Sequence, residues 1–383
     1  MTNRMNAAKP EIVLSANSCW NLVNFRGALL KGLQERGFQV TGAAPLDGSE
    51  GLLSRAGAAV EPIAIRSDGL NPLEDARLAV RYWRLLRRRR PAAFCGFTAK
   101  PNVYGCLAAG QLGIPAIANV SGLGTAFIRG GSLEKLITGL YTAAFRRAAL
   151  VFFQNREDRA LFVDRGIVRP EQAGLLPGSG VDLARFRPTR RSGDATGETR
   201  FLFVGRLIGD KGVREFADAA RIVRAARPDC RFALLGPLGV ANRTAITREE
   251  LDGWVGEGIL DYRGAADDVR PHLDWADAIV LPSYREGLSR VLLEGAAMER
   301  PLLASDVPGN RELVRDGVNG LSFSVRSADS MAEAMLRFAA MPFSQKQILA
   351  AAARRGVEVE FDEAIVVERY VNAIRAAIGP AAG

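Results

Sequence analysis

Short apolar segments alternate with amphipathic segments along nearly the whole chain, and no turn signal typical of a β-hairpin separates them. In the first half, this pattern predicts strands at residues 11–16, 38–43, 60–65, 92–97, 115–120 and 150–154. Apolar residues at helical spacing predict helices at residues 22–36, 49–56, 72–89, 101–112, 133–148 and 156–165. Strands joined through helices are parallel neighbours, so the alternation indicates an α/β fold with helices on both faces of a parallel sheet.

The composition changes at residues 177–200, which are rich in Gly, Pro, Ser, Thr and charged residues and therefore mark a domain boundary. A second alternation follows, with strands predicted at residues 200–204, 231–235, 259–262, 278–281 and 301–304. We therefore predict two doubly wound parallel-sheet (Rossmann-like) domains, at residues 1–180 and 200–360, with a linker at 181–199. The last predicted helix, 361–378, is expected to pack back on the first domain. Domains of this kind bind ligands in the cleft between them, at the carboxyl ends of their strands.

The composition excludes several kinds of site. Four cysteines are scattered without a CxxC pair, which indicates reduced thiols and no zinc motif. His272 is the only histidine, and its neighbours Pro271 and Leu273 suggest an ordinary helix position rather than a metal ligand or a member of a catalytic triad. The net charge of +9 favours phosphate or a membrane surface over nucleic acid, because no nucleic-acid motif accompanies it.

No membrane-crossing or export segment is predicted. The polar N-terminal residues do not have the pattern of a signal peptide. Residues 101–128 carry no charge and are long enough for a transmembrane helix, but Pro115, Gly122 and Gly124 interrupt them. A helix, a turn, a strand and a loop fit this segment better.

Residues 284–298 combine two carboxylates with the start of a helix. They follow the apolar strand at 278–281, Gly287 gives the loop conformational freedom, and Ser289 is a good N-cap. Glu286 then lies in the loop and Glu294 in the second turn of the helix, beside free N–H groups that attract phosphate. This arrangement suits a nucleotide-diphosphate-sugar. The alternative is an ordinary strand–loop–helix unit with two solvated carboxylates, so the pair needs support elsewhere in the chain.

A second phosphate-binding loop is predicted at residues 205–212, after the first strand of the second domain. Arg206 offers a planar fork and Lys211 a point charge, which together could neutralise a diphosphate leaving group without a metal ion. The chain has no Asp-x-Asp motif, the usual metal-binding device for nucleotide-sugars. The alternative is a loop with two solvated cations.

These two loops resemble the donor-binding half of the GT-B-fold retaining glycosyltransferases of family 4. Gly205-Arg206-Leu207 and Asp210-Lys211-Gly212 precede Glu286 and Glu294, which match the E-x7-E signature of that family, and residues 308–314 and 316–320 fit its pattern too. The resemblance covers essentially the whole chain. It implies a GT-B architecture of two Rossmann-like domains facing across a cleft, with 1–180 binding the acceptor and 200–360 the donor.

The resemblance also implies roles for individual residues. Arg206 and Lys211 would bind the donor diphosphate, Glu286 the sugar and Glu294 the ribose; Glu286, Arg206 and Lys211 are the predicted catalytic residues. The nucleotide base of the donor would lie near Arg263 and Gly264. The complete set of predicted donor contacts is Gly205, Arg206, Lys211, Arg263, Gly264, Glu286, Gly287, Leu288, Ser289 and Glu294.

Residues 97–105 and 119–124 are similar to a bacterial subgroup that extends polyprenyl-diphosphate-linked saccharides, of the N,N'-diacetylbacillosaminyl-diphospho-undecaprenol N-acetylgalactosaminyltransferase type. By this resemblance, Lys100 would meet the acceptor diphosphate; its alternative is a surface charge. The glycine-rich loop could equally be a plain turn. Many family-4 enzymes use a first-domain histidine that this chain lacks, so no catalytic base is assigned. The predicted acceptor-side residues are Asn17, Ser18, Lys100, Gly122, Leu123 and Gly124.

Residues 81–90 are basic and contain the aromatic pair Tyr82 and Trp83, so this helix could lie on anionic lipid. The helix at 133–148, with Arg146 and Arg147, is a second candidate. The alternative is a solvated basic face with Trp83 in the core.

The sequence thus predicts a retaining, metal-independent glycosyltransferase without a cofactor. It would move a hexose or N-acetylhexosamine from a nucleotide-sugar, preferably UDP-linked, to a polyprenyl-diphosphate saccharide during O-antigen, capsule, exopolysaccharide or protein-glycan assembly. It would be cytoplasmic and peripheral on the inner face of the cell membrane. A UDP-sugar 2-epimerase of the same architecture is disfavoured by the E-x7-E and Arg/Lys pairs, and a solute-binding protein by the lack of an export signal. A catalytically degenerate nucleotide-sugar-binding protein is a further alternative.

Overall fold

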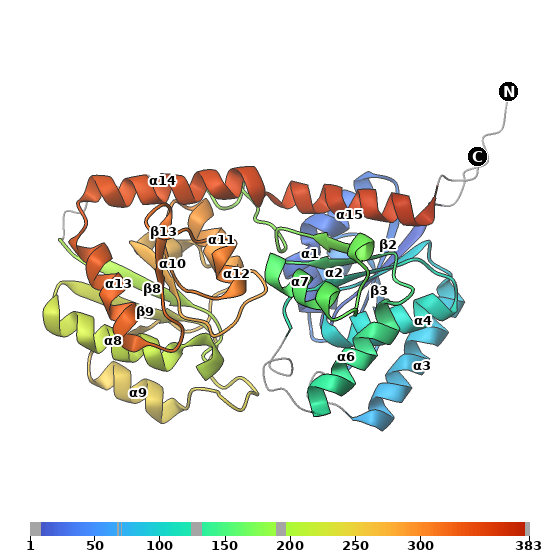
Figure 1. Ribbon diagram of the computed structural model, residues 1–383, viewed down its shortest axis with the longest axis horizontal. Helices are drawn as coiled ribbons and strands as arrows, with labels where there is room; N and C mark the ends of the chain where they lie inside the picture. Colours follow the sequence, from blue (N-terminus) through green and yellow to red (C-terminus); the bar gives the residue numbers. More distant parts are fainter. Residues whose placement is uncertain (1–8, 67–68, 70, 124–131, 189–196, 380–383) are drawn as a thin grey trace. The chain divides into compact units, whose positions relative to one another are not determined.

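The computed structural model describes residues 9–66, 69, 71–123, 132–188 and 197–379 (Figure 1). The chain forms two compact units. The first contains residues up to Ser179 together with those from Glu363 onward, and the second spans Gly180–Asp362. In each unit, a wholly parallel sheet lies between two layers of helices, so the predicted α/β class and doubly wound parallel sheets are confirmed.

The sheet of the first unit has the strand order β3-β2-β1-β4-β5-β6-β7. Helices α3, α4, α6 and α7 pack on one face, and α1, α2 and α15 on the other. The strands are β1 Glu11–Ser15, β2 Gln39–Ala44, β3 Ala59–Pro62, β4 Ala93–Gly96, β5 Ala116–Val120, β6 Leu150–Phe153 and β7 Ala173–Leu175. The helices are α1 Cys19–Glu35, α2 Glu50–Arg55, α3 Pro72–Arg89, α4 Cys106–Gln111, α6 Ser132–Phe145, α7 Arg156–Asp164 and α15 Glu363–Ile378.

The sheet of the second unit has the order β10-β9-β8-β11-β12-β13. Helices α8, α9 and α13 cover one face, and α10, α11 and α14 the other. The strands are β8 Thr199–Val204, β9 Cys230–Leu235, β10 Asp261–Tyr262, β11 Ala278–Leu281, β12 Leu302–Ser305 and β13 Gly320–Phe323. The helices are α8 Val213–Ala226, α9 Arg248–Gly256, α10 Arg270–Trp275, α11 Arg290–Ala297, α12 Pro308–Arg311, α13 Ala328–Ala340 and α14 Phe343–Glu360.

Both sheets reverse their strand order next to their first strand, between β1 and β4 in one unit and between β8 and β11 in the other. Ligands of doubly wound sheets bind at such a reversal, beyond the carboxyl ends of the strands. The loops predicted to bind the donor follow β8 and β11, and residues 17–18 and 97–100 follow β1 and β4. All four loops therefore start at a switch point of their own sheet.

Several elements differ from the sequence-based prediction. The edge strands β7 and β13 were not predicted, because Gly174 in β7 and Gly320 and Ser322 in β13 interrupt their apolar pattern. The helix predicted at 101–112 begins with a π-helical turn, Pro101–Gly105. Residues 181–188, predicted as linker, belong to the second unit: Val181 and Phe186 are buried in its core, and the Val181 N–H donates to the Phe361 carbonyl over 2.9 Å.

The last helix, α15, completes the first unit. Tyr370 is fully buried, with its ring centroid 5.1 Å from that of Phe152 and 5.7 Å from that of Phe97. Its hydroxyl accepts a 2.8 Å hydrogen bond from the side-chain amide of Asn119 on β5. The same Asn119 is held through its backbone by the buried side chain of Asn102. A polar network beneath the carboxyl ends of the strands thus fixes α15 to the sheet. In the described part of the chain, no helix combines the length and apolarity that crossing a membrane requires.

We expect Tyr370→Phe to lower the free energy of unfolding by about 1–3 kcal/mol, because the buried Asn119 amide loses its acceptor while the ring contacts remain. Tyr370→Ala should cost more, about 3–5 kcal/mol, because it also leaves a cavity. Urea unfolding followed by circular dichroism measures both. The exposed Arg375→Ala on the same helix is the control and should change stability by less than about 0.5 kcal/mol. A Tyr370→Phe variant as stable as wild type would contradict the role of the network.

Candidate active site

Two loops meet at the switch point of the second sheet because glycines allow their backbones to approach. Gly212 has φ +73°, and a Cβ there would lie 2.3 Å from the carbonyl oxygen of Pro282. Gly236 has φ +155°, and a Cβ there would lie 1.7 Å from the carbonyl oxygen of Gly205. Real Cβ atoms do not tolerate such distances, so any other residue would push the loops apart. The loop after β8 is therefore fixed between its neighbours.

The same approach brings Lys211 and Glu286 together from opposite loops. Lys211 ends a 3-10 turn, Gly209–Lys211, and its ammonium group forms an ion pair and hydrogen bond with the Glu286 carboxylate. Their side chains are only 22% and 13% exposed, so solvent screens the pair less than a surface pair. Two of the three predicted catalytic side chains thus contact each other directly.

The third predicted catalytic residue, Arg206, has no such partner in the described structure. It is exposed, and within the described residues no hydrogen bond or ion pair engages its guanidinium group. Its position directly after Gly205, at the end of β8, leaves the planar fork available for an anion.

Tyr284 makes three contacts, the first of which joins the two loops. Its backbone N–H donates to the Asp210 carbonyl over 2.9 Å, and its hydroxyl donates to the Glu215 carboxylate on α8 over 2.5 Å. The guanidinium carbon of Arg326 lies 4.5 Å from its ring centroid. Burial and the nearby Glu215 raise the pKa of Tyr284 to about 12, so the hydroxyl stays protonated as a donor. This connection was not predicted. Its only sequence signal is that Tyr284 lies two residues before Glu286 in the motif.

Helix α11 starts where the sequence predicts, because the Ser289 side chain accepts a hydrogen bond from the Leu292 N–H. Gly309 lies against this loop: a Cβ there would come within 2.4 Å of the Gly287 carbonyl oxygen. The carboxylate of Glu294 accepts a 2.7 Å hydrogen bond from Arg290, one turn earlier. Burial raises the pKa of Glu294 above its ordinary value, and the charge of Arg290 opposes that shift.

Arg263 and Gly264 follow β10, but the side chain of Arg263 turns back toward the amino ends of the strands. Its guanidinium carbon lies 3.7 Å from the ring centroid of Trp275, and its Nε donates to Asp261 over 2.9 Å. The backbone of Gly264 does lie at the carboxyl end, where its carbonyl accepts a hydrogen bond from Gly236. Backbone groups, rather than the Arg263 side chain, are therefore available there to contact the nucleotide base of a donor.

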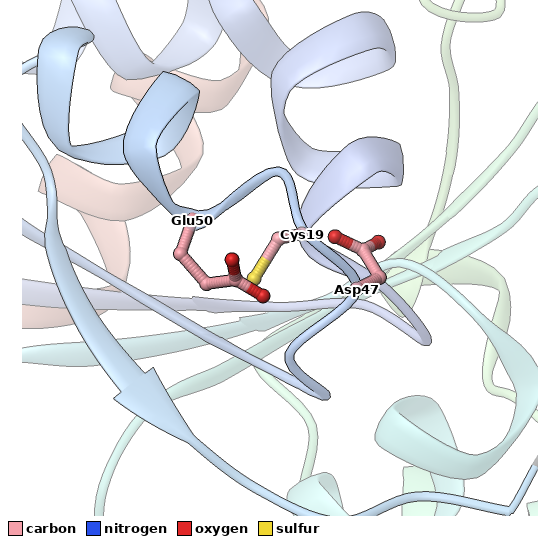
Figure 2. Close-up of side chains that lie close together, drawn as sticks. All are labelled: Cys19, Asp47 and Glu50. Atoms are coloured by element: carbon pink, nitrogen blue, oxygen red, sulfur yellow. The ribbon is translucent and has the colours of Figure 1, made fainter.

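In the first unit, Ser18 is engaged as the N-cap of α1, and the Asn17 side-chain oxygen is buried without a hydrogen bond in the described structure. Figure 2 shows the thiol of Cys19 beside the carboxylates of Asp47 and Glu50, all within 4.8 Å. Burial and these two carboxylates raise the pKa of the thiol to about 11, so it stays protonated, and Asp47 already accepts the Trp20 N–H. The group is a local hydrogen-bonding cluster.

The remaining acceptor-side residues lie at the carboxyl ends of β4 and β5. Leu123 is buried, Gly122 has φ +143°, and Gly124 lies outside the described residues. Lys100 is not a free surface charge: its ammonium group pairs with the buried Asp75 carboxylate over 2.8 Å. Burial and this Asp75 raise the pKa of Tyr104 to about 12. Sequence reasoning missed Asp75, which stands on α3 and gives no motif signal.

On α3, Tyr82 is fully buried and Trp83 packs against the core, with Arg87 stacked over the Trp83 ring at 4.9 Å. Its outer face nevertheless combines exposed arginines with two strongly exposed apolar residues, Leu73 and Val80. Arg147, predicted for the second basic helix, lies just beyond α6 and donates to the Gly110 carbonyl. Trp83 therefore packs on the core, as the solvated-face interpretation expects, while the outer face of α3 carries the basic and apolar residues that the lipid-binding interpretation expects.

Family models match both units. Residues 24–179 match the "Glycosyl transferase 4-like domain", and residues 198–340 match "Glycosyl transferases group 1". The chain is 24% identical to the N,N'-diacetylbacillosaminyl-diphospho-undecaprenol alpha-1,3-N-acetylgalactosaminyltransferase of Campylobacter jejuni, covering 92% of this chain and 95% of that protein. It is 25% identical to the UDP-Gal:alpha-D-GlcNAc-diphosphoundecaprenol alpha-1,3-galactosyltransferase of Escherichia coli, covering 69% and 70% of the two chains.

The solved structure of HepE from Anabaena in complex with UDP-glucose superposes with a TM-score of 0.77 at 17% identity, covering 95% of this chain and 99% of that one. At that identity, the likeness shows the fold alone. The two family models between them match most of the sequence, and the strand–loop–helix units that carry Lys211, Glu286 and Glu294 fall inside the second. The chain belongs to the GT-B-fold glycosyltransferases of family 4.

Proposed function

We propose that this protein is a retaining, metal-independent glycosyltransferase that uses a nucleotide-diphosphate-sugar, favoured to be UDP-linked. It would transfer a hexose or N-acetylhexosamine to a polyprenyl-diphosphate-linked saccharide in the assembly of an O-antigen, capsule, exopolysaccharide or protein glycan. The observation that carries the proposal is the Lys211–Glu286 ion pair beside the exposed Arg206 and the start of α11. The names of the two relatives, which mention diphosphoundecaprenol acceptors and in one case UDP-Gal, support the substrate classes.

The proposed mechanism follows from the charges in these loops. A donor diphosphate would replace Glu286 as the partner of Lys211, with Arg206 and the N–H groups at the start of α11 as further donors. The freed Glu286 carboxylate could then accept hydrogen bonds from sugar hydroxyls, and Glu294 from the ribose. Fixed positive groups stabilise the negative charge that grows on the diphosphate as its bond to the sugar breaks. No side chain of this chain is assigned as a base.

We further propose that the protein works peripherally on the inner face of the membrane, where its lipid-linked acceptor would be embedded. The support is the outer face of α3, on which Leu73 and Val80 are exposed in line with Arg84 and Arg87. Such a face can insert apolar side chains between lipids while its arginines contact anionic headgroups. An epimerase of the same fold has no support among the family matches.

Lys211→Ala should lower kcat about 100- to 1,000-fold, because one fixed donor to the leaving group is lost. The assay would offer UDP- and GDP-sugars with synthetic polyprenyl-diphosphate saccharides, with and without EDTA. Arg221→Ala, an ion-paired cation on α8, is the control and should be fully active. Transfer that stops in EDTA and returns with magnesium would contradict metal independence. Nucleotide binding without transfer from any donor would identify a degenerate family member instead.

Glu286→Gln should bind UDP more tightly than wild type while transferring sugar more slowly. In this variant, UDP no longer has to displace Glu286 from Lys211. Because that ion pair contributes about 1 kcal/mol, the affinity of the protein for UDP should rise roughly fivefold. Isothermal titration calorimetry measures the change. Glu250→Gln, which breaks the ion pair with Arg214 in the same unit, is the matched control and should leave UDP affinity unchanged. Weaker UDP binding by Glu286→Gln would show that Glu286 does not compete with UDP for the Lys211 ammonium group.

The double variant Arg84→Gln/Arg87→Gln should bind anionic vesicles more weakly at low salt. Two lost cations at about 1 kcal/mol each correspond to roughly a 30-fold loss in affinity. Cosedimentation with phosphatidylglycerol vesicles measures the loss, and Arg243→Gln/Arg248→Gln on the second unit is the control of equal charge. An equal loss in both double variants would mean that net charge, and not α3, attracts the protein to lipid.

A further inference from the structure

A cavity of about 400 Å³ opens at the amino ends of the strands of the second unit. It is lined by residues at the starts of β8, β9 and β10 and by Trp275, which ends α10. The switch-point loops with Lys211 and Glu286 follow the opposite, carboxyl ends of β8 and β11 in the same sheet. The cavity is therefore separate from the proposed active site.

Four arginines line this cavity: Arg200, Arg224, Arg231 and Arg263. Only two carboxylates, Glu198 and Asp261, line it with them, which leaves two positive charges in a concave site. Glu198 pairs with both Arg200, at 3.2 Å, and Arg231, at 3.0 Å. One carboxylate thus holds two guanidinium groups near each other.

The other two arginines differ in what they contact. The guanidinium carbon of Arg263 lies 3.7 Å from the ring centroid of Trp275 and that of Arg200 lies 6.0 Å from it, so cation–π contact with this ring helps to position both side chains. Arg224 extends from α8 over Gly258, where a Cβ would lie 3.7 Å from its Nη1. In the described part of the chain, Arg224 has no carboxylate partner.

We infer that this cavity binds a small anion that carries a phosphomonoester or a diphosphate. Guanidinium forks bind phosphate oxygens in pairs, and held side chains lose little entropy on binding. A phosphomonoester carries close to two negative charges above its second pKa of about 6, which matches the two excess positive charges. The same chemistry could come from a free phosphorylated metabolite or from the headgroup of a lipid such as phosphatidic acid.

The test titrates inorganic diphosphate into the Arg206→Ala/Lys211→Ala protein, in which the proposed donor site is disabled, using calorimetry without metal ions. One remaining site is expected, and adding Arg224→Ala should weaken it about tenfold, as for the loss of one charged hydrogen-bonding partner. Adding Arg224→Lys should weaken it less. Arg221→Ala, one turn earlier on α8 and paired with Glu257, is the matched control and should have no effect. Circular dichroism verifies that each variant is folded.

A second arm compares binding to phosphatidylcholine vesicles with and without phosphatidic acid. A diphosphate site sensitive to Arg224→Ala, with unchanged vesicle binding, supports the inference with a free ligand as the source. Vesicle binding that depends on phosphatidic acid and on Arg224 supports it with a lipid headgroup as the source. If Arg224→Ala changes neither binding, or changes them no more than Arg221→Ala, the cavity is only a surface network of ion pairs and the inference is wrong. Because the donor site is disabled throughout, this outcome is independent of the proposed transferase activity.

Discussion

The second unit depends on one constraint: neighbouring loops pack backbone against backbone, with no side chain between them. Gly212, Gly236 and Gly309 each bring a loop so close to the next that a Cβ would lie within 2.4 Å of a carbonyl oxygen. The three contacts are arranged around the switch point, where β8 and β11 are neighbours. Since packed backbones deform little, the loops have a fixed separation, and the side chains that they carry inherit that separation. Lys211 can reach Glu286, 75 positions later in the sequence, only because this spacing holds.

The polar groups at the site are distributed over elements of different rigidity. Glu294 is held on a helix, in a buried position, and pairs with a cation on its own helix. Lys211 and Glu286 come from loops, yet Tyr284 connects these loops through one backbone hydrogen bond. Arg206 alone remains exposed and unengaged in the described structure. The site therefore combines groups oriented before any ligand arrives with one cation that is free to adapt, a combination that suits a charged and flexible diphosphate.

The architecture could be predicted because it depends on local patterns. Alternating periods identified the strands and helices, and topology alone places the loops after β8 and β11 at a switch point. Contacts between distant residues could not be predicted in the same way. Asp75 neutralises Lys100 from another helix, and Glu215 accepts from Tyr284 across 69 positions, but neither carboxylate belongs to a motif. The direction of Arg263 depends on the position of Trp275, which only the folded chain reveals.

The place of α15 has a consequence for how the chain folds during synthesis. The first unit lacks one helix of its core until Glu363–Ile378 is synthesised, since the whole second unit lies between Ser179 and Glu363. Until then, the faces of Phe97 and Phe152 that Tyr370 will cover remain open to solvent. The first unit therefore has an incomplete core, with exposed apolar surface, until α15 has been synthesised and has packed against it. A change in α15 would accordingly destabilise the first unit, although the whole second unit separates α15 from the rest of that unit in sequence.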